Sequence, residues 1–413
     1  MGISVICTGT ELLRGSTVNT NLAALGAALT ARGVKVDAAY TIGDRAEDLY
    51  GALSAAVKHS DVLVLIGGLG PTADDLTLEA TARFFGVPLH TEPELVRKVD
   101  EFWARLHQGH CPKNQYKQAW LPDGGRAIPN PAGSASGIEF EAVYDHLTRH
   151  IFLMPGPPSE FIPMVRDFVA PRLDELTVKE RETVRGFLAA GVGESFASRL
   201  AEKALGGATP DLAYTANFEG TRVYVGAADP AAVEREFSLV HDALGEDALP
   251  EGEFSLAPYL VKLLAKSGLS LGTAESCTGG MVADAIVDVP GASQVFKGGV
   301  VAYDNAVKRD VLKVPAETLE RFGAVSAETA EAMARGAAEL LKTDCAIATT
   351  GIAGPAGGTA EKPVGLVYVG VFCRGECAVE EFHFRGERGA VRSRTVAKGL
   401  LKLVKMLQNG AKC

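Results

Sequence analysis

The stretch DVLVLIGGLGPTADD, residues 61–75, decides the fold class of the first part of this chain. Its first six residues form a nearly unbroken apolar run, typical of a strand that is buried on both faces of a parallel sheet. Upstream, residues 3–7 and 34–39 form further apolar runs, and residues 19–32 and 45–59 have helical patterns. This alternation of strand and helix predicts βαβ units with right-handed crossovers, and therefore an α/β fold.

The same alternation returns in the last third of the chain. Residues 269–274 and 345–349 are predicted to be buried strands, and Ser326 is a candidate N-cap for a helix over residues 327–342. The segment between the two α/β regions has shorter elements and more charge. We therefore predict three domains, which span residues 1–170, 171–252 and 253–413.

The composition is that of an ordinary globular protein, and it limits the function classes. The chain has 413 residues, of which 47% are hydrophobic and 22% are charged. A chain of this length is longer than one hydrophobic core usually organises. The formal net charge of -10 argues against a protein whose main task is to bind nucleic acid. No apolar run approaches the roughly 20 residues that a membrane span needs, and no signal peptide is apparent. We expect a cytoplasmic protein without a membrane partner, whose seven scattered cysteines are reduced thiols.

Glycines and carboxylates gather where the strands of the first domain end. In open α/β sheets, ligands bind at the carboxyl ends of the strands, and glycines there let backbone N–H groups approach a phosphate. Two adjacent aspartates beside that phosphate suit a hard divalent cation. Asp75 alone could equally cap the following helix. The candidate phosphate contacts are Gly68, Gly70 and Thr72, and the candidate metal ligands are Glu11, Asp44, Asp74 and Asp75.

A second candidate site begins at AESCTGG, residues 274–280, where a predicted strand gives way to a helix. A serine at such a turn exposes its hydroxyl beside helix N–H groups, which can stabilise an oxyanion or hold a phosphate. Ser276 could instead simply cap the helix. As a nucleophile it would need a base, and His383 is the only histidine of the last domain. Lys308, at the end of GGVVAYDNAVK (298–308), is therefore the candidate base, as in known Ser–Lys pairs.

Three features near Ser276 complete this second site. Cys277 is the alternative nucleophile, but free cysteine is commonly buried, so we favour the serine. Tyr303 ends a predicted strand, and the glycine-rich loop TTGIAGPAGGTAEKPVG (349–365) follows another. Each feature alone could be a packing residue or a turn, whereas three at successive strand ends indicate a site. The candidate substrate contacts are Glu275, Thr278, Gly279, Thr350, Gly351, Gly354, Gly357, Gly358 and Thr359.

These motifs occur in an order that resembles a known family. GTELLRG (9–15), NTN (19–21), GGLGPTADD, NPAGSASG (130–137) and MPGPPSE (154–160) resemble the molybdopterin-binding-like amino-terminal domain of the CinA family. AESCTGG, GGVVAYDNAVK and TTGIAGPAGGT resemble its carboxy-terminal domain. The middle segment is similar to a small KH-like α+β domain, but it lacks the G-x-x-G clamp of RNA-binding KH domains. We therefore expect a spacer or dimerisation element there, and not a nucleic-acid partner.

The resemblance implies two hydrolytic activities of pyridine nucleotide salvage. The carboxy-terminal domain would deamidate nicotinamide mononucleotide without a cofactor, with Ser276 as nucleophile and Tyr303 and Lys308 assisting. Arg388 and Arg392 are candidates to bind its phosphate. The amino-terminal domain would split ADP-ribose into AMP and ribose 5-phosphate with Mg²⁺, Mn²⁺ or Co²⁺, and with K⁺ as an optional accessory ion.

Two alternatives remain open, and both concern the class of function. The first domain could be a molybdopterin- or nucleotide-binding module without hydrolytic activity. The whole protein could instead be a DNA-associated competence or damage-response scaffold, although its acidic balance speaks against this. In either case we expect a homodimer, the commonest assembly of soluble proteins.

Overall fold

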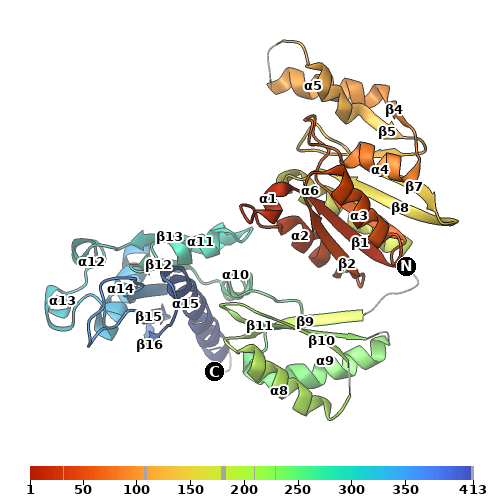
Figure 1. Ribbon diagram of the computed structural model, residues 1–413. Helices are drawn as coiled ribbons and strands as arrows, with labels where there is room; N and C mark the ends of the chain where they lie inside the picture. Colours follow the sequence, from red (N-terminus) through yellow and green to blue (C-terminus); the bar gives the residue numbers. More distant parts are fainter. Residues whose placement is uncertain (31, 107–108, 178–182, 209, 228, 411–413) are drawn as a thin grey trace. The chain divides into compact units, whose positions relative to one another are not determined.

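The apolar run after Asp61 forms strand β3 (Val62–Ile66), whose five residues are all buried. It belongs to a computed structural model that describes residues 1–413 except 31, 107–108, 178–182, 209, 228 and 411–413. The chain divides into two compact units, Met1–Val184 and Arg185–Cys413, coloured red to yellow and yellow-green to blue in Figure 1.

The first unit is built on a six-stranded sheet with the order β2-β1-β3-β8-β7-β6. Strands β1 (Ile3–Thr8), β2 (Ala38–Ile42), β3 and β8 (Leu147–Met154) run parallel to one another. Strands β7 (Gly137–Tyr144) and β6 (Arg126–Ile128) are antiparallel to their neighbours. The carboxyl ends of the parallel strands therefore meet at one edge of the sheet.

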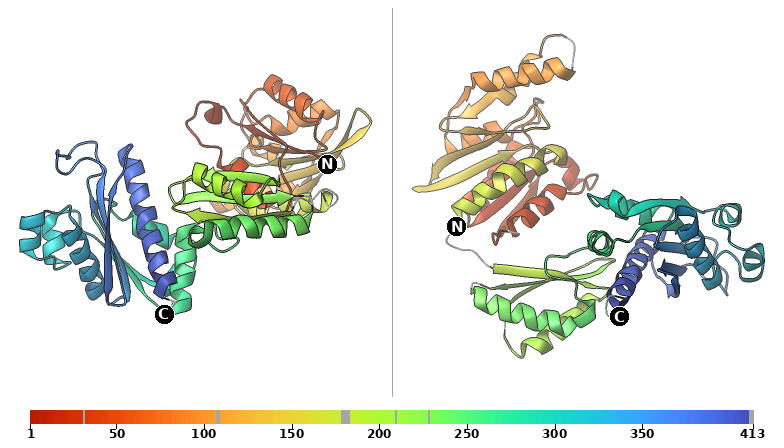
Figure 2. Two further views of the ribbon diagram at one scale, coloured as in Figure 1. Left: turned by 90° about the horizontal axis from the view of Figure 1, so that it is seen from below. Right: turned by 180° about the vertical axis from the view of Figure 1, so that it is seen from behind.

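Helices cover both faces of this sheet (Figures 1 and 2). Leu25 and Phe161 belong to the core on one face, and Leu53 and Leu78 belong to the core on the other. The first face is covered by α2 (Thr20–Thr30), α6 (Pro158–Met164) and α7 (Ala170–Leu176), and the second by α3 (Ala46–Ala56) and α4 (Thr77–Phe85). The remaining elements are α1 (Thr10–Leu13), β4 (Leu89–Thr91), α5 (Pro93–Leu106), η1 (Lys113–Ala119), β5 (Trp120–Pro122) and η2 (Val165–Val169).

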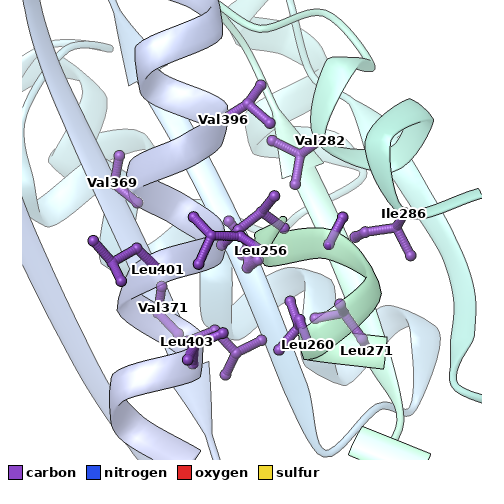
Figure 3. Packing of buried hydrophobic residues seen from close by; sticks show 14 of the residues in the cluster. Leu256, Leu260, Leu271, Val282, Ile286, Val369, Val371, Val396, Leu401 and Leu403 are labelled. Carbon is purple, nitrogen blue, oxygen red and sulfur yellow. The ribbon is translucent and has the colours of Figure 1, made fainter. Parts of the chain in front are cut away.

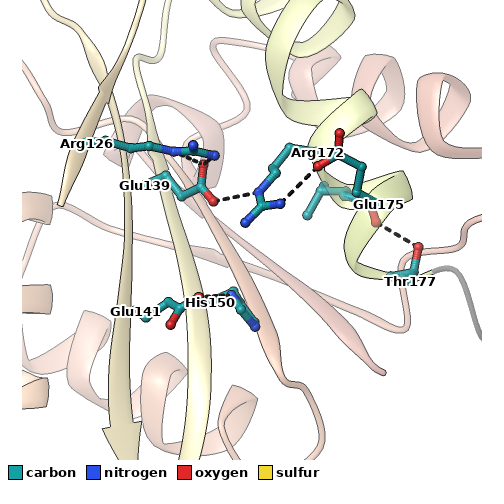
Figure 4. A network of polar contacts seen from close by, with 8 residues as sticks. Arg126, Glu139, Glu141, His150, Arg172, Glu175 and Thr177 are labelled. Carbon is teal, nitrogen blue, oxygen red and sulfur yellow. Dashed lines mark hydrogen bonds and ion pairs between the residues drawn. The ribbon is translucent and has the colours of Figure 1, made fainter. Parts of the chain in front are cut away.

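An arginine–glutamate cluster ties α7 to the sheet (Figure 4). Glu139 on β7 is 8% exposed and accepts hydrogen bonds from two arginines. Arg126 Nε donates to its Oε2 at 2.8 Å, and Arg172 Nε on α7 donates to its Oε1 at 2.9 Å. The predicted boundary at residue 170 therefore falls inside the first unit, which extends to Val184.

The second unit contains a five-stranded sheet with the order β13-β12-β14-β15-β16. Strand β12 (Leu271–Glu275) pairs in parallel with β13 (Phe296–Val301) and with β14 (Cys345–Gly351). Strands β15 (Leu366–Cys373) and β16 (Glu376–His383) complete the sheet as antiparallel neighbours. The carboxyl ends of β12, β13 and β14 thus lie at the same edge.

Alternate side chains of β14 enter two different cores. Cys345 and Ile347 join the core shown in Figure 3, whereas Ala346 and Ala348 join the core on the opposite face. The first face is covered by α10 (Leu256–Ser267), α11 (Met281–Val287) and α15 (Arg388–Gly410), and the second by α12 (Asn305–Asp310), α13 (Ala316–Phe322) and α14 (Ala327–Leu341). None of the helices that the structure describes is long and apolar enough to cross a membrane.

The predicted middle segment packs with the carboxy-terminal segment in one compact unit. Leu188 and Leu249 share one buried cluster with Leu256 and Leu260 of α10, which joins residues 171–252 and 253–413. From Arg185 onward the two predicted domains therefore form one unit. Its smaller sheet has the order β10-β11-β9 and consists of β9 (Thr183–Ala190), β10 (Asp211–Ala216) and β11 (Gly220–Ala227), with α8 (Glu194–Leu205), α9 (Pro230–Leu244) and the short η3 (Gly245–Asp247).

Two cysteines form a disulfide, which corrects the expectation of reduced thiols throughout. Cys345 on β14 lies directly opposite Cys373 on the antiparallel strand β15, and the two are bonded. The two cysteines meet because of the register between β14 and β15. Their spacing along the sequence does not reveal this pairing. Cys7, Cys111, Cys277 and Cys377 are free.

Candidate active sites

Ser276 lies immediately after β12, on a turn that leads into α11. Its backbone N–H donates to Thr349 O of β14 at 2.9 Å, and its hydroxyl has no hydrogen-bond partner in the described part of the chain. Helix α11 begins only at Met281, and its N-cap is Gly280 with φ of 99°. Ser276 is therefore not the helix cap, and its hydroxyl is available.

Glu275 caps the helix instead. Its carboxylate is 1% exposed and accepts from the N–H groups of Gly280 (2.9 Å) and Val282 (2.9 Å). It also accepts from the N–H of Ala283 (2.8 Å) and the hydroxyl of Thr278 (2.7 Å). A carboxylate is favourable at this end of a helix. Glu275 and Thr278, which we predicted to contact substrate, are both buried, and their side chains hold the turn.

Lys308, the candidate base, is buried on α12 with 1% exposure. Its Nζ donates to Ala302 O (2.8 Å) and Tyr303 O (3.2 Å). Burial lowers the pKa of this lysine, and the charges of Asp304 and Cys277 oppose that shift. A neutral amine has two N–H bonds and one lone pair. Since two carbonyls can take both N–H bonds, the lone pair stays free to accept a proton.

Cys277, the alternative nucleophile, is 6% exposed. Burial raises the pKa of its thiol to about 12, and hydrogen bonds from the Cys277 backbone and from Thr349 oppose that shift only in part. The thiolate is the nucleophilic form of cysteine, and it is scarce at neutral pH when the pKa is this high. The environment therefore favours Ser276 over Cys277.

Arg388 and Arg392 bring three predicted features together at the start of α15. Arg388 donates to the Tyr303 hydroxyl (3.2 Å) and to Gly354 O (2.9 Å). Arg392, one turn later, donates to Thr278 O at 2.7 Å. Its Nε is buried and has no partner in the described part of the chain. The turn, the end of β13 and the glycine loop thus converge on one pair of guanidinium groups.

The predicted contacts of the glycine loop divide into internal and exposed positions. Thr350, which we predicted to contact substrate, is 0% exposed, and its hydroxyl donates to Ala324 O at 2.6 Å. Gly351 still belongs to β14, where Val367 leaves no room for a Cβ. Gly354 is buried and meets Arg388 through its carbonyl. The exposed positions of the loop are Gly357, Gly358 and Thr359, and Gly279 in the AESCTGG turn is exposed as well.

The first unit has a cavity of about 500 Å³ beside the carboxyl ends of its parallel strands. Its lining is rich in carboxylates and glycines, as expected for a site that binds a phosphate with a cation. The predicted residues that line it are Glu11, Asp44, Gly68, Gly70, Asp74 and Asp75.

Thr72, predicted to contact phosphate, is exposed and forms hydrogen bonds with both aspartates. Its hydroxyl donates to Asp74 Oδ1 and to Asp75 Oδ2, both at 2.5 Å. The bond from Thr72 lowers the pKa of Asp74. Helix α4 begins at Thr77 and has Leu76 as its N-cap, so Asp75 does not cap it. The loop therefore presents two carboxylates to the cavity.

Lys117 anchors this acidic loop, a role that sequence reasoning missed. Its Nζ donates to the backbone carbonyl of Asp75 and pairs with Glu79 at 2.8 Å. Nearby, Asn114 Nδ2 donates to Pro71 O at 3.3 Å. The motif NQYKQAWLP (114–122), which contains both residues, was the available signal.

Sequence reasoning also missed polar residues that line the cavity from other elements. Asn21 is 8% exposed, and its Nδ2 donates to Gly156 O at 2.6 Å. Its Oδ1 has no partner in the described part of the chain. The two asparagines of the motif NTN (19–21) were the sequence signal that could have identified Asn21 as a residue of the cavity. The other missed lining residues include Asn19, Gln118 and Glu160.

The donors of this cavity determine which cation could bind. They are oxygen atoms of carboxylates, hydroxyls and amides, which hard cations prefer. Among the residues that the structure describes, no three His, Cys, Asp or Glu side chains form a metal-binding group. Mg²⁺ is commonly held by one or two carboxylates together with substrate phosphates. The residues therefore fit a cation that is completed by phosphate oxygens.

Comparison with known proteins matches both parts of the chain. The family model "CinA C-terminal domain" matches residues 253–407, and "Probable molybdopterin binding domain" matches residues 4–175. The CinA-like protein of Dictyoglomus thermophilum is 39% identical over 411 residues, which covers 97% of this chain and 98% of that protein. The CinA-like protein of Dictyoglomus turgidum is 38% identical over 418 residues, covering 99% and 100%.

A solved structure is also similar to part of the chain. The competence/damage inducible protein CihA from Agrobacterium tumefaciens is 44% identical, and the alignment covers 36% of this chain and 92% of that chain, with a TM-score of 0.36. Together with the full-length relatives, the two family matches show that this chain belongs to the CinA family, with a molybdopterin-binding-like domain followed by a CinA C-terminal domain.

Proposed function

We propose that the second unit is an amidohydrolase that converts nicotinamide mononucleotide and water to nicotinate mononucleotide and ammonia. The observation that carries the proposal is the Ser276 turn, which presents an unbonded hydroxyl after β12. A buried lysine, whose pKa is lowered by burial, lies at the neighbouring strand end. Lys308 Nζ donates to Ala302 O at 2.8 Å, and Ala302 N donates to the carbonyl of Glu275, the residue before Ser276, at 2.8 Å. Membership in the CinA family supports the same reaction.

In the first half of the reaction, Ser276 Oγ attacks the carboxamide carbon and its proton passes to Lys308 Nζ. The N–H groups of Thr278 and Gly279 have no acceptor in the described part of the chain, so they can donate to the oxyanion. The C–N bond then breaks, and ammonia leaves with the proton from Lys308. Ser276 and Lys308 share no hydrogen bond without substrate, and such catalytic contacts commonly tighten when substrate binds.

In the second half, water attacks the acyl-enzyme while Lys308 accepts its proton. The acyl–oxygen bond to Ser276 breaks, nicotinate mononucleotide forms, and the proton returns to the serine. Arg388 and Arg392 supply positive charge for the 5′-phosphate, and guanidinium groups match phosphate geometry well. Tyr303 is 63% exposed, so its ring is available to contact the nucleotide.

Ammonia release from nicotinamide mononucleotide tests this proposal in the presence of a metal chelator. The wild-type chain should release ammonia, and Ser276→Ala should release none. Ser293→Ala, at an exposed serine, is the matched control and should behave as wild type. Undiminished ammonia from Ser276→Ala would rule out the serine as nucleophile.

For the first unit we propose metal-dependent hydrolysis of ADP-ribose to AMP and ribose 5-phosphate. Its cavity combines glycines at strand ends with five carboxylates, so a pyrophosphate can bind there only together with cations. Asp74 and Asp75 would hold the cation with the phosphate oxygens, and the bound ion would neutralise charge on the phosphoryl group. The backbone at Gly68 and Gly70 would approach the phosphates closely.

Release of AMP from ADP-ribose, with and without Mg²⁺, Mn²⁺ or Co²⁺, tests this second activity. Asp74→Asn and Asp75→Asn should each abolish it, whereas Asp123→Asn, at an exposed aspartate outside the cavity, should not. Binding of ADP-ribose without AMP release would instead identify the first unit as a nucleotide-binding module.

A further inference from the structure

The glycine loop of the second unit is anchored by Lys362, to which sequence analysis assigned no role. Its Nζ donates to Phe322 O at 2.6 Å and to Val325 O at 2.7 Å. The side chain is partly buried, and both of these partners are backbone carbonyls rather than carboxylates. Carbonyl oxygens in a turn are also the ligands that proteins use for monovalent cations. The ammonium therefore occupies the kind of position that a free cation could take.

The turn that receives this ammonium, Phe322–Val325, has all four of its carbonyls engaged by side chains. Besides the two that accept from Lys362, Gly323 O accepts from the Thr329 hydroxyl at 2.7 Å. Ala324 O accepts from the Thr350 hydroxyl at 2.6 Å. Gly323 has φ of 76°, and a Cβ there would lie 3.1 Å from Lys362 Nζ. The glycine thus provides both the turn and the space for the cation.

The same lysine is linked to the exposed part of the loop. Its backbone N–H donates to Thr359 Oγ1 at 3.0 Å, and Thr359 N donates back to Lys362 O at 2.9 Å. On the other limb of the loop, Arg388 holds Gly354 O at 2.9 Å. Gly357, Gly358 and Thr359, which face solvent, are therefore fixed from both sides.

We propose that the turn Phe322–Val325 is a monovalent-cation site whose occupant in this chain is the Lys362 ammonium. This tethered cation holds the glycine loop in the conformation that binds the nucleotide. Lys362 is a positioning residue, because it acts through the loop and touches no reacting atom. It sets the affinity for substrate and leaves the chemistry at Ser276 unchanged. The kinetic part of its test rests on the proposed deamidase activity.

Lys362→Met removes the charge from the full-length chain and keeps most of the side-chain volume. KM and kcat for ammonia release are measured in KCl and in choline chloride at equal ionic strength. In choline chloride we expect KM to rise roughly tenfold or more, because two charge-assisted hydrogen bonds are lost. The value of kcat should stay within about twofold, and K⁺ should lower KM again by entering the vacated turn.

Two further variants separate this role from a general loss of stability. Lys362→Arg keeps the charge and should keep most of the affinity, without a response to K⁺. Lys266→Met, at an exposed lysine on α10, should behave as wild type in both salts. If Lys362→Met does not fold, Lys362→Gln takes its place in the same measurements. A fall in kcat with unchanged KM, or equal KM values in KCl and choline chloride, would overturn the proposal.

Hydrogen exchange of residues 352–365 provides a readout that does not depend on the deamidase activity. In Lys362→Met these amides should exchange faster in choline chloride than in KCl, whereas the wild type should show no difference. If the wild type releases no ammonia but this exchange pattern is observed, only the proposed reaction is refuted. Unchanged exchange in Lys362→Met would refute the cation site itself.

Discussion

Glu275→Gln is predicted to destabilise the second unit selectively. Oε2 of the carboxylate accepts from the Thr278 hydroxyl and from the N–H groups of Gly280 and Val282, at 2.7 to 2.9 Å. Oε1 accepts from Ala283 N at 2.8 Å. Glutamine can keep the first three bonds with its single carbonyl oxygen. Its amide NH₂ must then face the N–H of Ala283, donor against donor, inside a site that is 1% exposed.

The size of the effect follows from these contacts. A buried donor without an acceptor costs about 1–3 kcal/mol, and each of three bonds loses about 1 kcal/mol when its acceptor becomes neutral. Relief from burying a charge offsets about 2 kcal/mol of this loss. We therefore expect the free energy of unfolding of the second unit to fall by about 3 kcal/mol, a large part of a typical total.

The two tryptophans of the chain make the measurement selective, because Trp103 and Trp120 both lie in the first unit. Urea unfolding is followed by tryptophan fluorescence, which reports the first unit, and by far-UV circular dichroism, which reports both. Only the transition of the second unit should move. Glu317→Gln, at an exposed acid in the first turn of α13, is the control. A shift below about 1 kcal/mol, or an equal shift of both transitions, would refute the capping role of Glu275.

Three further predictions concern other residues of the two sites. Cys277→Ala should keep ammonia release within about threefold of wild type, because a thiol whose pKa is about 12 is ionised only to about one part in 10⁵ at pH 7; a loss above about 100-fold would make Cys277 the nucleophile. Burial depresses the pKa of Lys308, so the unfolded chain binds more protons than the folded chain between that depressed value and the ordinary value of 10.5. The stability of the second unit should therefore rise with pH across that window more steeply in the wild type than in Lys308→Met. Melting is followed by circular dichroism over a pH series, and the same pH dependence of the melting temperature in both proteins would contradict this. Lys117→Met should raise the metal concentration for half-maximal AMP release roughly tenfold, since the acidic loop loses its anchor; Lys113→Met, at an exposed lysine of η1, should leave it unchanged.

Strand ends could be predicted from the sequence, because buried parallel strands are continuous apolar runs. Residues 61–66 and 345–349 behave in this way, and their carboxyl ends carry the two candidate sites. The N-cap at Ser326 is also confirmed, because its Oγ accepts from Thr329 N at 3.2 Å. Each of these signals depends on the residues of one continuous segment, and it can therefore be read from a single sequence.

The direction of polar side chains near these strand ends could not be predicted in the same way. Glu275 points inward because the N–H groups at the start of α11 need an acceptor. Thr350 is turned toward Ala324, which belongs to a distant turn. Contacts of this kind depend on how separate elements meet, and no pattern along a single segment encodes them.

The buried cluster that joins Leu188 and Leu249 to α10 has a consequence for where the protein can be divided. A fragment that begins at residue 253 would lose both leucines and leave Leu256 and Leu260 partly facing water. Exposed apolar patches of this kind promote self-association. A fragment that begins at Arg185 keeps the cluster whole. The middle segment therefore shields an apolar face of α10 from water, and a fragment without it is expected to self-associate unless polar residues replace Leu256 and Leu260.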